Sequence, residues 1–116
     1  MATTLTESEV TPRRAQATLA AQIMRQESVF WGLPDAQRPA LKWFTDRSHC
    51  VGQFDADINT VWLWAGLEGE DLVRVVGHEM QHAADWHGGR LFTEHGARLA
   101  EESAIKRHRG RSNDAA

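Results

Sequence analysis

The sequence predicts a small α+β domain, and three observations support this class. A run rich in β-branched and aromatic residues over 51–67 is interrupted by a polar turn, which is typical of a β-hairpin. A long amphipathic helical pattern follows at once over 70–86. The chain has 116 residues, of which 41% are hydrophobic, enough for one core but not for two. We therefore expect a short mixed or antiparallel sheet with an N-terminal, a central and a C-terminal helix.

The two ends of the chain differ in composition from the part between them. Residues 1–10 are polar and rich in threonine, and residues 110–116 are polar and follow a basic run. We expect both ends to be flexible, and we expect a single domain over 11–109.

The first third of that domain predicts a helix, a connection and a strand. Thr11 followed by Pro12 is typical of a helix start, and apolar residues then recur at helical spacing, which predicts a helix over 12–26. Glycine and proline residues over 30–39 indicate a connection. The short apolar run over 40–45 predicts the first strand.

The middle of the chain predicts a hairpin. Strands over 52–54 and 60–64 flank a turn over 55–59 that is rich in Asp and Asn. Because side chains alternate along a strand, the second strand should point its aliphatic residues to one face and its tryptophans to the other. These residues are Val61 and Leu63 on one side, and Trp62 and Trp64 on the other.

Two helices complete the predicted domain. The segment over 70–86 carries a wide apolar face and acidic residues in its first turn, and the Gly88-Gly89 pair indicates where it ends. A weaker apolar stripe, mainly of alanine, predicts a last helix over 93–107. Strands and helices together account for nearly the whole chain.

Composition and charge exclude several classes of function. Thirteen Lys and Arg against sixteen Asp and Glu give a net charge of −3, so there is no bulk positive field and we expect no nucleic-acid partner. Cys50 is the only cysteine, which excludes an intrachain disulfide and a thiolate metal cluster. No apolar run is long enough for a membrane span, and the first ten residues do not resemble a signal peptide, so we expect no membrane partner and a cytoplasmic location.

A metal-binding pattern lies in the middle of the predicted central helix. Residues 78–82 read His-Glu-Met-Gln-His, the HExxH pattern. Residues four apart lie on one face of a helix, so His78 and His82 can present imidazole nitrogens to a single Zn²⁺. Glu79 is rotated by about 100° from His78, which suits a general base that acts on water without binding the ion.

A catalytic zinc site requires a third protein ligand. Glu94 is the first candidate, because it follows His82 by twelve residues, beyond the Gly88-Gly89 break, and lies on the first turn of the next predicted helix. Glu101, His87 and Asp85 are the alternatives.

The segment over 51–104 resembles a minimal zincin metallopeptidase of the gluzincin type. In several gluzincins the ligand glutamate is followed three positions later by alanine, and Glu94 and Ala97 have that spacing. Many members then carry an acidic residue that holds a zinc-ligating histidine, but Arg98 stands here, so another residue, such as Asp85, must do so. The metzincin pattern fits less well, because it requires glycine where Asp85 stands and histidine where Gly88 stands.

The resemblance implies a zinc metallopeptidase whose peptide or protein substrate pairs with an edge strand near 60–64. Water activated by the zinc and Glu79 would attack the peptide carbonyl, and a second donor would stabilise the oxyanion. The chain has no tyrosine, which leaves His95, His87 or Arg90 for this role; we favour His95 because it neighbours the ligand Glu94.

Two other classes of function remain as alternatives. The protein could instead be a binding module that retains the zincin architecture but does not catalyse a reaction. A zinc-dependent endoribonuclease of the ribosomal RNA maturation type would space its histidines as H-x3-H-x5-H, whereas His78, His82 and His87 are one residue short of that spacing. A domain this small leaves few residues for specificity loops, so a partner protein or a narrow set of natural targets would supply specificity.

Overall fold

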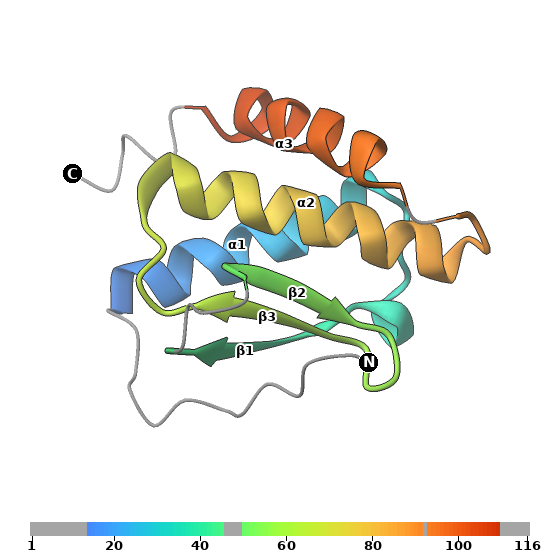
Figure 1. Ribbon diagram of the computed structural model, residues 1–116, viewed down its shortest axis with the longest axis horizontal. Helices are drawn as coiled ribbons and strands as arrows, with labels where there is room; N and C mark the ends of the chain where they lie inside the picture. The colour runs from blue at the N-terminus through green and yellow to red at the C-terminus, as the bar shows by residue number, and fades with distance from the viewer. Residues whose placement is uncertain (1–13, 46–49, 92, 110–116) are drawn as a thin grey trace.

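The computed structural model describes residues 14–45, 50–91 and 93–109. They form an α+β domain in which three helices accompany a three-stranded mixed sheet (Figure 1). In chain order the elements are α1 (Arg14–Phe30), a short 3-10 helix (Asp35–Gln37), β1 (Ala40–Phe44), β2 (Gly52–Asp55), β3 (Thr60–Trp64), α2 (Gly69–His87) and α3 (Glu94–His108). The α+β class is therefore confirmed, and so is the mixed sheet. The predicted flexible ends, 1–10 and 110–116, lie outside the described residues.

The sheet has the order β1-β3-β2. The hairpin pairs β2 with β3 antiparallel, and β1 joins the other side of β3 in parallel. The turn between β2 and β3 places Asn59 at a φ of 47°, a backbone conformation that asparagine tolerates better than most residues. The Asn59 side-chain amide also donates to the carbonyls of Gln37 and Arg38, which fixes the hairpin turn beside the 3-10 helix.

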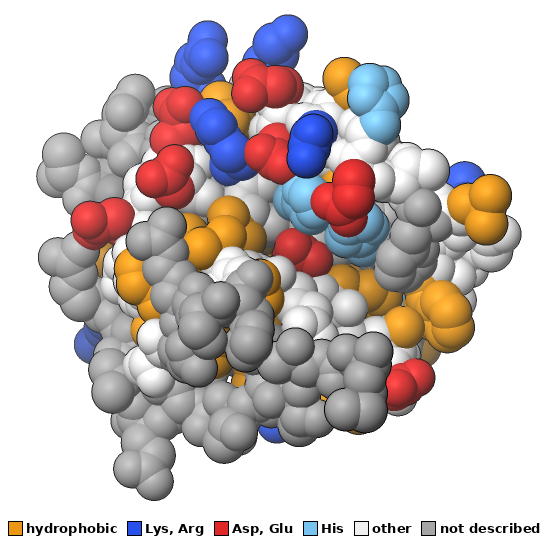
Figure 2. Space-filling model, viewed as in Figure 1, with side chains coloured by type: hydrophobic (Ala, Val, Ile, Leu, Met, Phe, Trp, Pro, Cys, Tyr) orange, Lys and Arg blue, Asp and Glu red, His pale blue; other side chains and the backbone are white. Residues whose placement is uncertain are grey.

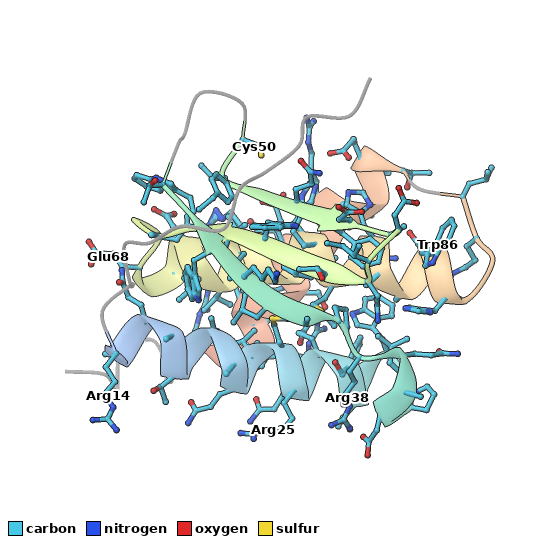
Figure 3. The ribbon with its side chains drawn as sticks, turned by 90° about the horizontal axis from the view of Figure 1, so that it is seen from below. Arg14, Arg25, Arg38, Cys50, Glu68 and Trp86 are labelled. Carbon is cyan, nitrogen blue, oxygen red and sulfur yellow. The ribbon has the colours of Figure 1, made fainter. Side chains whose placement is uncertain are left out.

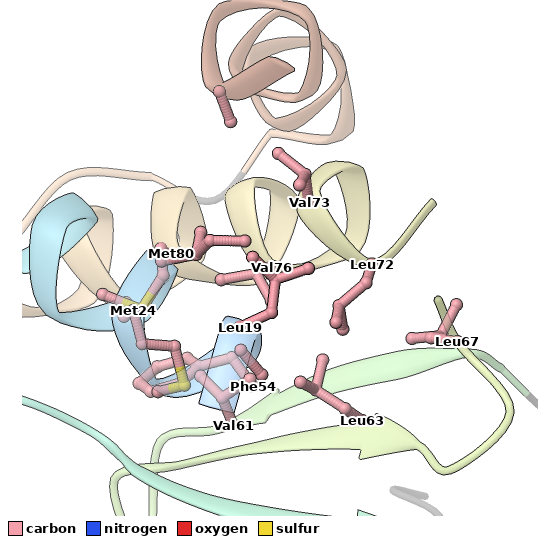
Figure 4. Close-up of a cluster of buried hydrophobic side chains, with 14 of the residues drawn as sticks. Leu19, Met24, Phe54, Val61, Leu63, Leu67, Leu72, Val73, Val76 and Met80 are labelled. Carbon is pink, nitrogen blue, oxygen red and sulfur yellow. The ribbon is translucent and has the colours of Figure 1, made fainter. Parts of the chain in front are cut away.

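The core lies between the sheet, α1 and α2 (Figure 4). As the alternation predicted, Val61 and Leu63 of β3 point into this core. Helix α2 contributes a continuous apolar face whose residues Leu72, Val76 and Met80 are fully buried. Burial of each such side chain stabilises the fold by about 1.5–3 kcal/mol relative to exposure.

Helix α1 extends four residues beyond its predicted end at residue 26. The extra turn contains Glu27 and Ser28, polar residues that are nevertheless buried. Ser28 donates its hydroxyl hydrogen to the carbonyl of Met24, and the Glu27 carboxylate accepts hydrogen bonds from Arg107 at 2.8 Å and from His108 at 2.9 Å. Partners about eighty residues away thus satisfy the buried carboxylate of Glu27, which lies just beyond the predicted end of the helix. The predicted start at Thr11 and Pro12 lies outside the described residues.

Helix α2 lies between α3 and the rest of the core (Figure 1). Gly77 makes the close approach of α2 and α3 feasible, because a Cβ there would lie 2.5 Å from the Ala104 Cβ and 3.3 Å from the Ala100 carbonyl oxygen. The break at Gly88-Gly89 is confirmed, and Thr93 caps α3 by accepting a hydrogen bond from the Gly96 amide. The turn brings the first residues of α3 back over the second half of α2.

Candidate metal centre

The two histidines of the HExxH pattern lie together on α2. His78 and His82 are one turn apart, and their ring centroids are separated by 4.9 Å. Burial lowers the pKa of His82, the charge of His78 lowers it further, and Glu94 acts in the opposite direction. The lowered pKa favours the neutral imidazole, which is the form that binds a metal ion.

Glu94, at the start of α3, completes a three-residue cluster with these histidines. One of its carboxylate oxygens lies 3.2 Å from the Nε2 atom of His78, and the other lies 3.1 Å from the Nε2 atom of His82. A set of donor atoms from the three residues lies within 4.8 Å of one another. Two imidazoles and a carboxylate are the donor set of a catalytic zinc site, so these residues can hold a metal ion.

The structure thus brings together the three residues that the sequence predicted as ligands, with Glu94 in the third place. Figure 2 shows histidine and acidic side chains gathered at a hollow on this face of the molecule. His87 is engaged elsewhere, because its Nε2 atom lies 3.0 Å from the side-chain oxygen of Asn59. Asp85 is buried and accepts hydrogen bonds from Gln81 and Arg90.

Glu101 has a role that the sequence did not reveal. The sequence suggested it only as an alternative ligand. In the structure its Oε2 atom lies 2.7 Å from the Nδ1 atom of His78, whereas the other ring nitrogen, Nε2, faces Glu94. A carboxylate in this place fixes the tautomer and orientation of a metal-binding histidine. Asp85, predicted above for such a role, accepts hydrogen bonds from Gln81 and Arg90. The available signal was the spacing, since Glu101 follows Glu94 by two helical turns and so shares its face of α3.

Glu79 is buried beneath strand β2, with 6% of its surface exposed. Gly52 allows this approach, because a Cβ there would lie 3.3 Å from a Glu79 carboxylate oxygen and 2.5 Å from the Val75 side chain. Burial raises the pKa of Glu79 to about 7; His78 and a hydrogen bond from the Phe54 amide lower it, while Glu94 raises it further. A carboxyl with this pKa can both accept and donate a proton near neutral pH.

These side chains share one cleft with a volume of about 940 Å³. Strand β2, the segment that links β3 to α2, helix α2 and helix α3 all contribute to its walls. Figure 3 shows that Cys50 lies at the start of β2, and that Glu68 and Trp86 lie at opposite ends of α2. Cys50 and Glu68 line the cleft, so it extends from the histidines towards the N-terminal end of α2.

The three residues considered as oxyanion donors do not line this cleft. His95 is exposed on the first turn of α3, although it follows Glu94 directly. His87 contacts the hairpin turn, as described above, and Arg90 donates to Asp85 and to the Ala84 carbonyl. The structure therefore does not bring any of them to the metal cluster.

The prediction that residues 60–64 form an edge strand, with which a substrate could pair, is wrong. Strand β3, over 60–64, is hydrogen-bonded on both sides because β1 and β2 flank it, so it has no free edge. Strand β2 is the edge strand beside the cleft, and residues 50–54 line it. A local hydrophobic pattern gives strands but not their order in the sheet, which explains the error.

Comparisons with protein-family models, with curated proteins and with solved structures gave no match to this chain. Within the described part of the chain, no helix combines the length and the apolar character needed to cross a membrane.

Proposed function

We propose that this protein is a zinc-dependent metallopeptidase that hydrolyses internal peptide bonds. One observation carries the proposal: His78, His82 and Glu94 converge on one point, and the buried carboxyl of Glu79 lines the same cleft. Metal-assisted hydrolysis requires protein ligands for the ion and a neighbouring acid. Here two histidines and one carboxylate can serve as the ligands, and Glu79 is the neighbouring acid.

His78, His82 and Glu94 would hold the zinc ion, and Glu101 would keep the His78 ring in its binding orientation. Zinc bound there supplies a Lewis acid that polarises a carbonyl group and lowers the pKa of water. Glu79 would take a proton from the attacking water and deliver it to the departing amine. Burial raises the pKa of Glu79, which favours proton uptake from water.

Strand β2 supports a peptide as the substrate. It forms an edge of the sheet and runs along the cleft that contains Glu79 and the histidines. An extended peptide can add to such an edge through main-chain hydrogen bonds. The carbonyl of the bond to be cleaved would then face the histidine cluster.

Metal removal tests this function. We expect the protein to bind one equivalent of Zn²⁺ and to cleave members of a generic fluorescence-quenched peptide library. Chelation should abolish cleavage, and added Zn²⁺ should restore it, whereas the variants His82→Ala and Glu94→Ala should lose zinc affinity. Stoichiometric zinc binding without any cleavage would contradict the proposal and would favour a non-catalytic binding module.

A further inference from the structure

Arg74 lies on α2 one helical turn before His78, on the face of the helix that lines the cleft. It is the only lysine or arginine among the described residues of the cleft wall. Its side chain is 35% exposed, although its Nε atom is buried. Arg74 is therefore the one permanent cation that the described chain places in the cleft beside the metal cluster.

The donors of Arg74 are not used by hydrogen bonds to described residues. Its closest carboxylate contacts are 3.7 Å, from Nη2 to Glu70, and 3.9 Å, from Nε to Glu101. Both distances exceed those of a hydrogen bond. The Nε atom is buried and has no hydrogen-bond partner in the described part of the chain. Two acidic neighbours thus hold the guanidinium by charge, and neither lies within hydrogen-bond distance of it.

We propose that Arg74 donates hydrogen bonds to a main-chain carbonyl oxygen of the peptide substrate, and so fixes the peptide in the cleft. This inference rests on the proposed peptidase function. The site needs a polar donor for the substrate, and the candidates His95, His87 and Arg90 all lie outside the cleft wall. An arginine presents several N–H groups in a fixed planar arrangement, which suits a carbonyl acceptor.

The charge of the cleft selects a carbonyl over a free carboxylate as the acceptor. Among the described residues of the cleft wall, five carboxyl groups stand against one guanidinium: Glu68, Asp71, Glu79, Glu94 and Glu101. A bound divalent cation offsets only part of this excess. The negative field disfavours a substrate's C-terminal carboxylate, because like charges at close range repel. Arg74 should therefore favour internal segments of a chain, and the enzyme should act as an endopeptidase.

The test compares two probes that differ only at one end. One is a library of N-acetylated, C-terminally amidated peptides, and the other is the same library with free C-terminal carboxylates. We expect the zinc-loaded wild type to prefer the amidated library. The substitution Arg74→Met should lower kcat/KM on that library by about 10- to 100-fold, as expected for loss of a charge-assisted hydrogen bond. The loss should occur mainly as a rise in KM, because the contact exists before the reaction starts.

Controls separate substrate binding from a structural role of Arg74. Arg74→Lys should recover part of the activity, and Arg25→Met, which removes an exposed arginine of α1 outside the cleft wall, should stay within about twofold of wild type. Arg74→Met should keep the zinc stoichiometry and affinity of the wild type. An unchanged kcat/KM for Arg74→Met, a loss explained by weaker zinc binding, or a preference for free C-termini would each overturn the inference.

A binding measurement distinguishes failure of this inference from failure of the proposed function. Calorimetry on the zinc-loaded Glu79→Gln protein reports peptide binding without turnover. We expect Arg74→Met, added to this variant, to weaken binding of the best amidated peptide by the same 10- to 100-fold, about the effect of one charged hydrogen bond. Peptide binding that depends on Arg74, combined with no cleavage by the wild type, would contradict the peptidase function but support the carbonyl contact.

Discussion

Gly77 controls the distance between the two helices that carry the metal cluster. It lies next to His78 on α2 and faces Ala100 and Ala104 of α3. In Gly77→Ala the new methyl group would lie 2.5 Å from the Ala104 Cβ and 3.3 Å from the Ala100 carbonyl oxygen. Neither methyl group can rotate away, since each is attached directly to its backbone, so the helices must separate.

The expected magnitude follows from these distances. Carbon atoms make favourable contacts at about 3.5–4.0 Å, so relief of the contact with Ala104 requires a movement of about 1 Å. Overpacking of this kind costs up to about 3 kcal/mol, and the better helix propensity of alanine returns about 1 kcal/mol, which leaves a loss of about 2 kcal/mol. The same movement would lengthen the contact of 2.7 Å from His78 to Glu101 and that of 3.2 Å to Glu94. Zinc affinity should therefore fall by about tenfold or more.

Thermal unfolding and zinc titration measure both effects. We expect the melting temperature of metal-free Gly77→Ala to fall by about 8–16 °C, from about 4–8 °C per kcal/mol in a domain of this size. The double variant Gly77→Ala/Ala104→Gly moves the methyl group from one helix to the other, so its stability and zinc affinity should return to within about 1 kcal/mol of wild type. A single variant as stable as wild type, or a double variant that recovers nothing, would refute the role given to Gly77.

Two further predictions concern charged residues. Glu101→Ala should weaken zinc binding by about 10- to 100-fold, because His78 loses the group that orients it, whereas Glu102→Ala on the exposed face of α3 should leave zinc affinity unchanged; equal affinities in the two variants would contradict this role. Burial alone would raise the pKa of Glu27, but hydrogen bonds from His108 and Arg107 and their charges lower it below its ordinary value of 4.5. Its contribution to stability is therefore present above about pH 4.5 and is lost as the pH falls through the lower pKa of the folded state. Urea unfolding at a series of pH values measures this contribution. At pH 7, Glu27→Gln should be less stable than the wild type by about 3 kcal/mol, and its stability should fall less steeply as the pH is lowered. Parallel curves of stability against pH for the two proteins would contradict the prediction.

The sequence predicted most of the elements because each depends on a local pattern. The periodicity of α2 and the alternation of β3 determine which of their faces are buried, whatever the rest of the chain does. Glu94 could be predicted for a related reason. The glycine break after α2 and the cap at Thr93 define a turn between two helices, and the first residue of α3 then faces the second half of α2.

The features that the sequence missed depend on contacts between distant segments. The extra turn of α1 is stabilised by partners of Glu27 at the far end of the chain. The placement of β3 at the centre of the sheet depends on the parallel pairing with β1, which no local pattern encodes. Likewise, Glu101 reaches His78 only because α3 packs on α2 at the distance that Gly77 allows.

The most direct test of the metallopeptidase account is peptide cleavage by Glu79→Ala at full zinc occupancy. Glu79 is not one of the three residues of the metal cluster, so the variant should bind one equivalent of Zn²⁺ as the wild type does. The account predicts that the zinc-loaded wild type cleaves the amidated peptide library and that the equally loaded variant does not, because the group that moves the proton is gone. Undiminished cleavage by Glu79→Ala would contradict the account.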